Sequence, residues 1–354
     1  MSATNPKVEQ ERPSGPRGLP VADQDELITV VIPARNEERF IARCLDSVLA
    51  QEARNLQVVV VDGASEDRTP DIVRQYAARD PRVELLSNPD RIVPISLNIG
   101  ARAARSRWFV RIDAHATVPP DYVGRAVGHL RSGRWGGVGG RVDCVGVTPA
   151  GRAIALAMGS RFGIGNSIHH YGNQPQPADH VPFPAYPVAL IHEIGGWDDH
   201  LAVNQDFEFD YRLGRAGHKL LYDPNLSIAY HGQQSIRGVF RQFRRYGSGK
   251  VKVLAKHPES VRARHFAAPA LVAWSVAATA VALRRPKLGA AAVAPYLGAV
   301  AAVSLANARK LDDGADRVRL PLAFAAMHVG WGLGFWEGVI RLVRGRRPGS
   351  PAGP

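Results

Sequence analysis

Cysteine is scarce in this sequence, and so are the signals of secretion. Cys44 and Cys144 are the only two cysteines in 354 residues, and neither falls in a CxxC or Cys/His spacing that binds zinc. The first residues carry prolines and charges but no apolar core, unlike a signal peptide. These absences predict a reducing, cytosolic environment, and we expect residues 1–26 and 344–354 to be disordered tails.

Two phosphate-binding motifs are also missing. No GxGxxG follows the first apolar run, and no GxxxxGK[ST] occurs anywhere. Their absence disfavours a dinucleotide dehydrogenase and a P-loop enzyme. A nucleotidyltransferase would need a glycine-rich, lysine-bearing loop after the first strand, where this chain has ARNEER. That class is disfavoured as well.

Positive charge is in excess, but it is unevenly distributed. The formal net charge is +13. Residues 1–236 hold 25 basic and 27 acidic side chains, residues 237–265 hold nine and one, and the remainder holds eleven and four. Because the first two-thirds of the chain is nearly neutral, a general nucleic-acid-binding surface is disfavoured. An anionic membrane surface is the expected partner of the basic segment.

Long apolar runs are confined to the end of the chain. Residues 266–283 and 288–306 contain no charge, and neither do residues 321–336. A helix needs about 20 apolar residues to cross a bilayer, so the first two runs are candidate spans and the third is a weaker span or an interfacial helix. The alternative is a soluble domain of alanine-rich helices. We expect two or three membrane-associated helices over 266–343, and removal of residues 266–354 should make the chain soluble.

Strand and helix patterns alternate from residue 27 to residue 250, ahead of a basic juxtamembrane segment at 251–265. Short apolar runs predict buried strands at 28–32, 57–61, 83–86 and 108–112. Helical patterns lie between them, and Ser65 is expected to cap the second helix. The alternation predicts an α/β domain with a mostly parallel, Rossmann-like sheet and helices on both faces. Ligands of such sheets bind at the carboxyl ends of the strands.

Polar side chains follow the predicted strands directly. Asn36 and Glu37 follow the first strand, Asp62 ends the second, and Asp113 follows the fourth. An ionised carboxylate only accepts hydrogen bonds, so Asp62 suits a ribose hydroxyl or a base N–H. Any one of these acids could instead be an ordinary loop residue that caps a helix.

Asp113 and His115 form the candidate metal site. In an extended or turn conformation, residues two apart point the same way. The carboxylate suits a hard divalent cation that bridges two phosphates, and a borderline cation such as Mn²⁺ also accepts the imidazole. The alternative is a helix-capping aspartate beside an incidental histidine.

A second candidate centre begins a predicted helix at 206–216. Gln205 and Asp206 would lie at its N-terminus, where the helix end favours an ionised carboxylate and therefore a general base. Asp206 could alternatively be a simple N-cap. Glu208 and Asp210 are expected to be solvent-facing or structural.

Five motifs in this order resemble the inverting, nucleotide-sugar-dependent glycosyltransferases of family 2. They are VVIPARNEE, VVVVDGASEDRT, LNIGARAARSRWFVRIDAHA, GGWDDHLAVNQDFEFDYRLGRAG and QFRRYGSGK. The RIDAHA segment and the apolar tail are most similar to the succinoglycan-type bacterial exopolysaccharide glycosyltransferases. The resemblance implies the GT-A fold, a divalent cation (Mn²⁺ or Mg²⁺) and a nucleotide-sugar donor, with UDP-sugar expected.

The resemblance also implies roles for individual residues. The implied donor-binding residues come from the PxxNE segment, the end of the second strand, the segment near the diphosphate, the DxD-like segment and a QxxRW-like segment. In chain order they are Pro33, Asn36, Glu37, Asp62, Arg91, Asn98, Asp113, Gln242, Arg245 and Tyr246. The family's DxD appears as Asp113 and His115, so histidine occupies the position of direct metal contact. The ED pair appears as Gln205 and Asp206, with Asp206 at the position of the catalytic base.

The implied reaction is a single displacement that moves a hexose to a hydroxyl of a lipid-linked or polysaccharide acceptor. The expected location is the cell membrane, with the catalytic domain on the cytoplasmic side. The alternative is a non-catalytic, membrane-tethered nucleotide-sugar-binding protein of the same fold, because His115, Gln205 and Tyr246 depart from the commonest motif residues.

Overall fold

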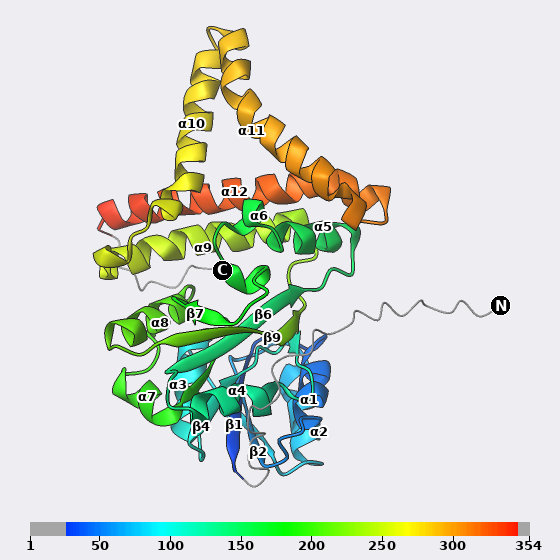
Figure 1. The fold of residues 1–354 in the computed structure, drawn as a ribbon, viewed down its shortest axis with the longest axis vertical. Helices are drawn as coiled ribbons and strands as arrows, with labels where there is room; N and C mark the ends of the chain where they lie inside the picture. Colours follow the sequence, from blue (N-terminus) through cyan, green and yellow to red (C-terminus); the bar gives the residue numbers. More distant parts are fainter. Residues whose placement is uncertain (1–25, 346–354) are drawn as a thin grey trace, which may run out of the picture.

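The computed structural model describes residues 26–345, so the two expected tails lie almost wholly outside the described residues. An α/β domain forms one end of the molecule, and a layer of long helices covers it (Figure 1). The strands are β1 (Ile28–Ala34), β2 (Leu56–Asp62), β3 (Val83–Ser87), β4 (Trp108–Arg111), β5 (Ala116–Thr117), β6 (Gly137–Cys144), β7 (Gln176–Ala178), β8 (Ala185–Pro187) and β9 (Leu220–Tyr230). The helices of the α/β domain are α1 (Ile41–Leu49), α2 (Thr69–Ala77), α3 (Val93–Ala103), α4 (Tyr122–Arg131), α7 (Val188–Glu193) and α8 (Gln205–Arg215).

The sheet has the order β3-β2-β1-β4-β8-β6-β9-β5, and β7 also pairs with β9. β1, β2, β3 and β4 are parallel to their neighbours within this group, and β6 is parallel to β9. β8 is antiparallel to both β4 and β6. The predicted mostly parallel sheet is therefore confirmed, with antiparallel strands added in its second half.

Apolar residues on both faces of the sheet bury it between two layers of helices. In β1, Ile28, Val30 and Ile32 face the core shared with α1, α2 and α4. Val31 faces the core shared with α3, α7 and α8. Successive side chains of a strand point to opposite faces, so a continuous apolar run is what a doubly covered strand requires.

Two local details differ from the sequence expectation. β1 extends past Pro33 to Ala34, because its pairing with β4 ends at Val31 and the missing proline N–H removes no bond there. Ser65 does not cap α2, which begins at Thr69. Instead, the Ser65 hydroxyl donates to Asp62, at 2.5 Å from Oδ1.

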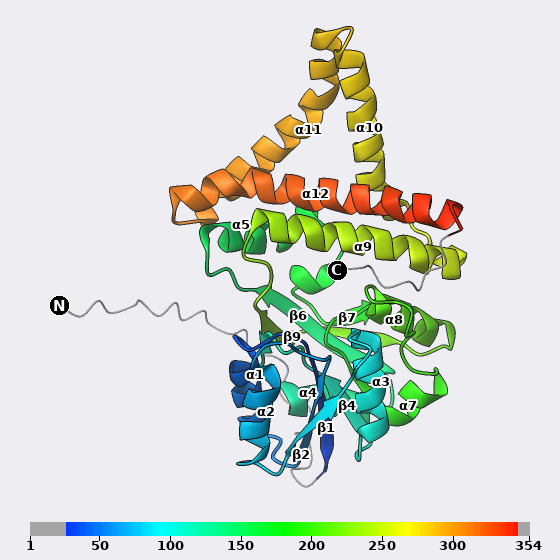
Figure 2. The same cartoon turned by 180° about the vertical axis from the view of Figure 1, so that it is seen from behind.

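A second group of helices lies across one end of the α/β domain. Its members are α5 (Pro149–Met158), α6 (Arg161–Ile164), α9 (Ile236–Lys256) and α12 (Gly314–Val343). Figure 2 shows α9 and α12 lying lengthwise against each other, with α9 on the side of the sheet. Their apolar side chains form a third core, which includes Val239, Phe243, Phe324 and Met327.

Glycine allows α9 and α12 to approach closely. Gly330, Gly334 and Gly338 recur every four residues along α12. A Cβ at Gly334 would lie 1.8 Å from the carbonyl oxygen of Arg244, and a Cβ at Gly247 would lie 2.0 Å from that of Trp331. The two backbones are therefore in direct contact, as in small-xxx-small helix pairs.

The hairpin formed by α10 (Ala267–Ala282) and α11 (Pro286–Asn307) projects from this layer away from the sheet (Figure 1). The segments Ala263–Ala282 and Pro286–Lys310 are long and apolar enough to cross a membrane, and most of each is exposed. α12 contains the third apolar run, expected to be a weaker span or an interfacial helix, and it packs along α9. The domain boundary expected at residue 250 falls inside α9, which continues unbroken to Lys256.

Candidate active site

Arg111 is at the centre of the candidate site. It is the last residue of β4, and its side chain is only 5% exposed. Its Nε donates to Asp113 Oδ1 at 2.8 Å, and its Nη1 donates to Asp206 Oδ1. One guanidinium thus joins the end of β4 to the first turn of α8, bringing the two predicted carboxylates together.

Arg111, Asp113 and Asp206 stabilise one another's charged forms. Burial alone would lower the pKa of Arg111, but Asp113 and Asp206 outweigh burial and raise it. The arginine therefore stays charged, and both carboxylates gain a fixed cationic partner. Asp206 Oδ2 accepts only a weak bond of 3.3 Å from the Gln205 amide, and the Asp206 side chain is 20% exposed, so Arg111 leaves this oxygen without a strong partner.

His115 lies beside Asp113 and is oriented by Glu37. Its Nδ1 is 2.8 Å from Glu37 Oε1, and its ring packs edge-on against Tyr230. Burial would lower the pKa of His115, but the hydrogen bond and charge of Glu37 outweigh it and raise the pKa. A carboxylate on Nδ1 places the N–H there and leaves the lone pair of the neutral imidazole on Nε2.

Asp62 and Asn36 organise the loops after β2 and β1. Asp62 Oδ2 accepts the backbone N–H of Ser65 at 3.1 Å, and the Ser65 hydroxyl accepts the N–H of Asn36 at 2.9 Å. The Asn36 side chain accepts the N–H of Glu66 at 2.8 Å. Asn36 has a φ of 56°, the left-handed region that asparagine tolerates better than most residues. Arg91 contacts the loop after β2 through an exposed ion pair with Glu66.

Tyr246 connects α9 to the start of α8, next to Asp206. Its carbonyl accepts the Asn204 side-chain amide at 3.0 Å, directly before α8, and Gln242 donates to its hydroxyl at 2.8 Å. Burial raises the pKa of Tyr246, and the charges of Asp113 and Asp206 add to the rise, so the phenol lies within their electrostatic reach. Arg245 is on the exposed side of α9.

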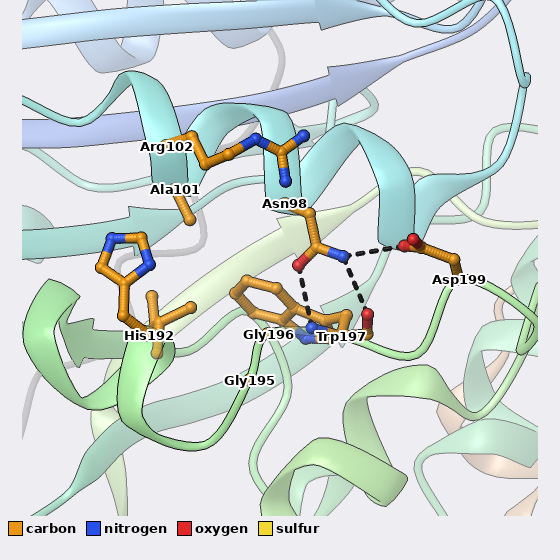
Figure 3. A pocket seen from close by; sticks show the side chains of 9 residues that line it. Asn98, Ala101, Arg102, His192, Gly195, Gly196, Trp197 and Asp199 are labelled. Carbon is orange, nitrogen blue, oxygen red and sulfur yellow. Dashed lines mark hydrogen bonds between the residues drawn. The ribbon is translucent and has the colours of Figure 1, made fainter.

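Asn98 has a different environment. Its amide donates to the carbonyl of Trp197 and to Asp199, and its oxygen accepts the N–H of Trp197 (Figure 3). It borders a hollow of about 310 Å³ that Arg102 and His192 also line. The structure therefore uses Asn98 to hold the loop before α8, and none of these contacts joins it to Asp113.

Glu208 and Asp210 are structural, as expected, but both are buried. Glu208 binds Arg212, Lys256 and His257, which ties α8 to α9. Asp210 accepts from Tyr186 at 2.5 Å and from the backbone of Val181. These contacts fix the helix that carries Asp206.

Sequence reasoning missed Arg111. The signal available was a charged residue inside the apolar strand WFVRI, two residues before Asp113. A charge in a buried strand needs a partner, but the sequence could not show that one partner is Asp206, 95 residues away.

Comparison with solved structures assigns the fold of the chain. The structure resembles the "Mannosyltransferase PcManGT from Pyrobaculum calidifontis in complex with GDP-Man and Mn2+", with a TM-score of 0.55 and 24% identity, over 88% of this chain and 87% of that one. That likeness concerns the fold, and the fold is GT-A.

Sequence comparison assigns the family. The sequence model of "Glycosyl transferase family 2" matches residues 29–193. The "Succinoglycan biosynthesis protein ExoA" of Rhizobium meliloti (strain 1021) is 31% identical over 89% of this chain and 96% of its own length. The "Dolichyl N-acetyl-alpha-D-glucosaminyl phosphate 3-beta-D-2,3-diacetamido-2,3-dideoxy-beta-D-glucuronosyltransferase" of Methanococcus voltae is 25% identical over 65% of this chain and 74% of its own length. The chain belongs to glycosyl transferase family 2 and is a glycosyltransferase.

Proposed function

We propose that this enzyme is an inverting, membrane-associated hexosyltransferase. It takes the sugar from a nucleoside diphosphate sugar and transfers it to a hydroxyl of a lipid-linked or polysaccharide acceptor. The observation that carries the proposal is the pairing of Asp113 and Asp206 by the buried Arg111. Arg111 binds the proposed metal ligand Asp113 through Nε and Nη2, and the proposed base Asp206 through Nη1.

The residues fit a divalent cation. Asp113 offers carboxylate oxygen, and His115 offers Nε2, because Glu37 occupies Nδ1. Among residues 26–345, no three His, Cys, Asp or Glu side chains converge on one point. Asp113 and His115 would therefore hold the metal together with oxygens of the donor diphosphate and water. A bound Mn²⁺ or Mg²⁺ supplies positive charge to the leaving diphosphate.

Asp206 supplies the base. Its Oδ2 takes the proton of the acceptor hydroxyl while the hydroxyl oxygen forms a bond to the anomeric carbon. The bond from that carbon to the diphosphate oxygen breaks, and the configuration inverts. Arg111 holds Oδ1, so the free oxygen keeps one orientation. Asp62 and the Asn36 loop are proposed to bind the nucleoside, and Arg91, Gln242, Arg245 and Tyr246 to line the diphosphate side.

The proposed membrane attachment depends on the hairpin of α10 and α11. α10 and α11 leave apolar side chains exposed, among them Trp274, Val276, Leu283, Leu297 and Leu305. Burying such surface in lipid contributes about 25 cal/mol per Å². The proposed arrangement inserts the hairpin in the cell membrane and keeps α9 and α12 at its cytoplasmic surface. The catalytic domain, from about residue 27 to 250 in our proposal, then faces the cytoplasm.

A binding protein without turnover is the second candidate. The observation in its favour is that Arg111 already neutralises both carboxylates. A donor screen with UDP-glucose, UDP-galactose, UDP-N-acetylglucosamine and GDP-mannose, with and without Mn²⁺, separates the two. Metal-dependent transfer to a lipid-linked acceptor supports the enzyme. Tight donor binding with no transfer or hydrolysis of any donor supports the binding protein.

A further inference from the structure

Lys250 is a buried cation that the proposed reaction leaves without a role. It lies on α9 at the end of the QFRRYGSGK motif, and it is 7% exposed. Its Nζ is 3.1 Å from the centre of the Phe207 ring. Phe207 directly follows Asp206 in the first turn of α8, so the amine contacts the helix turn that carries the proposed base.

No carboxylate among residues 26–345 forms an ion pair with Lys250. Its neighbours on α9 are paired differently: Arg244 binds Glu337, and Lys256 binds Asp198 and Glu208. The charge that acts on Lys250 is that of a second cation, Arg264. Burial, with Arg264 adding to it, lowers the pKa of Lys250 to about 7. A buried amine beside another cation is costly unless an anion compensates it.

The place of Lys250 indicates where such an anion comes from. A Cβ at the adjacent Gly249 would lie 2.2 Å from Val203, so α9 is pressed against the loop before α8 at this point. Arg264 lies in the short 3-10 helix Ala263–Phe266, which leads directly into the apolar helix α10. Lys250 thus contacts the first turn of α8, and the charge of Arg264, which directly precedes α10, acts on it.

We propose that Lys250, with Arg264, binds the phosphate group of a lipid-linked acceptor. The inference rests on the proposed function, because a lipid-linked acceptor brings a phosphate to the membrane surface and its sugar hydroxyl to Asp206. An ammonium and a guanidinium both pair strongly with phosphate. The Phe207 ring also stabilises the ammonium through a cation–π contact.

Binding of farnesyl phosphate to the full-length protein in detergent tests the site without any sugar transfer. UDP and GDP in excess keep the donor site filled. We expect Lys250→Met to weaken binding of farnesyl phosphate about tenfold or more, a loss of about 1.4 kcal/mol. The matched control is Lys252→Met, two residues along on another face of the same helix, which should bind within about twofold of wild type.

Thermal unfolding without ligand distinguishes lost binding from lost folding. Lys250→Met should unfold at the same temperature as wild type or higher, because a buried unpaired amine is replaced by an apolar chain of similar length. Unchanged farnesyl phosphate affinity in Lys250→Met would overturn the proposal. So would equal affinity of the wild type for farnesol, or equal competition by inorganic phosphate or by phosphatidylglycerol, which would assign the site to another anion. Absence of sugar transfer in the wild type, with farnesyl phosphate binding that still depends on Lys250, would count against the proposed function alone.

Discussion

At the residue scale, the arrangement depends on one arginine in an apolar strand. Arg111 satisfies two carboxylates that come from segments far apart in sequence. Removing one partner of a buried charge network leaves the others uncompensated, which costs about 3–5 kcal/mol. Arg111 is therefore expected to set both the geometry of the site and part of its stability.

Substitution of Arg111 separates these two effects. Arg111→Met should lower kcat about 100-fold, because Asp206 loses the partner that orients it. Arg111→Lys should recover part of the rate, since it keeps the charge but not the planar fork. Steady-state kinetics with donor and acceptor varied separately provide the measurement. A Met variant with normal kcat and only a raised donor KM would show that Arg111 does not act through Asp206.

The local parts of the site could be predicted from sequence, and the joining contacts could not. Apolar periodicity located β1, β2 and β4, so Asn36, Asp62 and Asp113 were placed at strand ends. The start of α8 likewise placed Asp206 at a helix N-terminus. The bond between Arg111 and Asp206, however, depends on how β4 and α8 pack, and no local pattern records that packing.

At the element scale, α8, α9 and α12 are held by two kinds of contact. Glu208 ties α8 to α9 through charge, and glycine backbones tie α9 to α12. The glycine repeat at 330, 334 and 338 was visible in the sequence and would have predicted close helix packing, which hydropathy, favouring a weaker span or an interfacial helix, did not indicate.

Gly334→Leu should separate α9 from α12. Even its Cβ would meet the carbonyl oxygen of Arg244 at 1.8 Å, and that backbone cannot move aside cheaply. We expect a clear loss of thermal stability, of several kcal/mol, as for severe overpacking. The control is Gly298→Leu on α11, where no atom lies within 4 Å of the added Cβ. Equal unfolding temperatures for the two variants would contradict the packing.

Glu208 should make stability depend on acid pH. Burial would raise its pKa, but hydrogen bonds from Arg212, Lys256 and His257 outweigh burial and hold the pKa below its ordinary 4.5. Its contribution is therefore complete above pH 4.5 and is lost as pH falls through the lowered value. Glu208→Gln should be less stable at pH 7 and should show a shallower acid decline in unfolding temperature. A parallel decline in both proteins would assign the acid sensitivity elsewhere.

At the scale of the whole molecule, the chain is a catalytic domain, a layer of amphipathic helices and an apolar hairpin. This arrangement alters the result that we expect from deleting residues 266–354, which hydropathy alone predicts to give a soluble chain. Removing residues 266–354 deletes α12 along with the hairpin, and it uncovers Val239 and Phe243 in the third core. The apolar surface exposed would cost roughly 2 kcal/mol for each large side chain.

We therefore expect that truncation to aggregate, whereas polar substitution of the hairpin should release a folded chain. Replacing Trp274, Val276, Leu283, Leu297 and Leu305 with serine or glutamine alters only exposed positions. Membrane fractionation and size-exclusion chromatography without detergent provide the readout. A soluble, monomeric 266–354 deletion with wild-type stability would show that α12 is not part of the folded core.

The most direct test of the central claim is sugar transfer by Asp206→Asn, measured beside donor binding in the same protein. The amide keeps the shape of the side chain but cannot accept the proton at neutral pH. We predict that turnover with saturating donor and acceptor falls by about 100- to 10,000-fold, while donor affinity stays close to that of the wild type. Near-normal turnover in Asp206→Asn would contradict the assignment of Asp206 as the base.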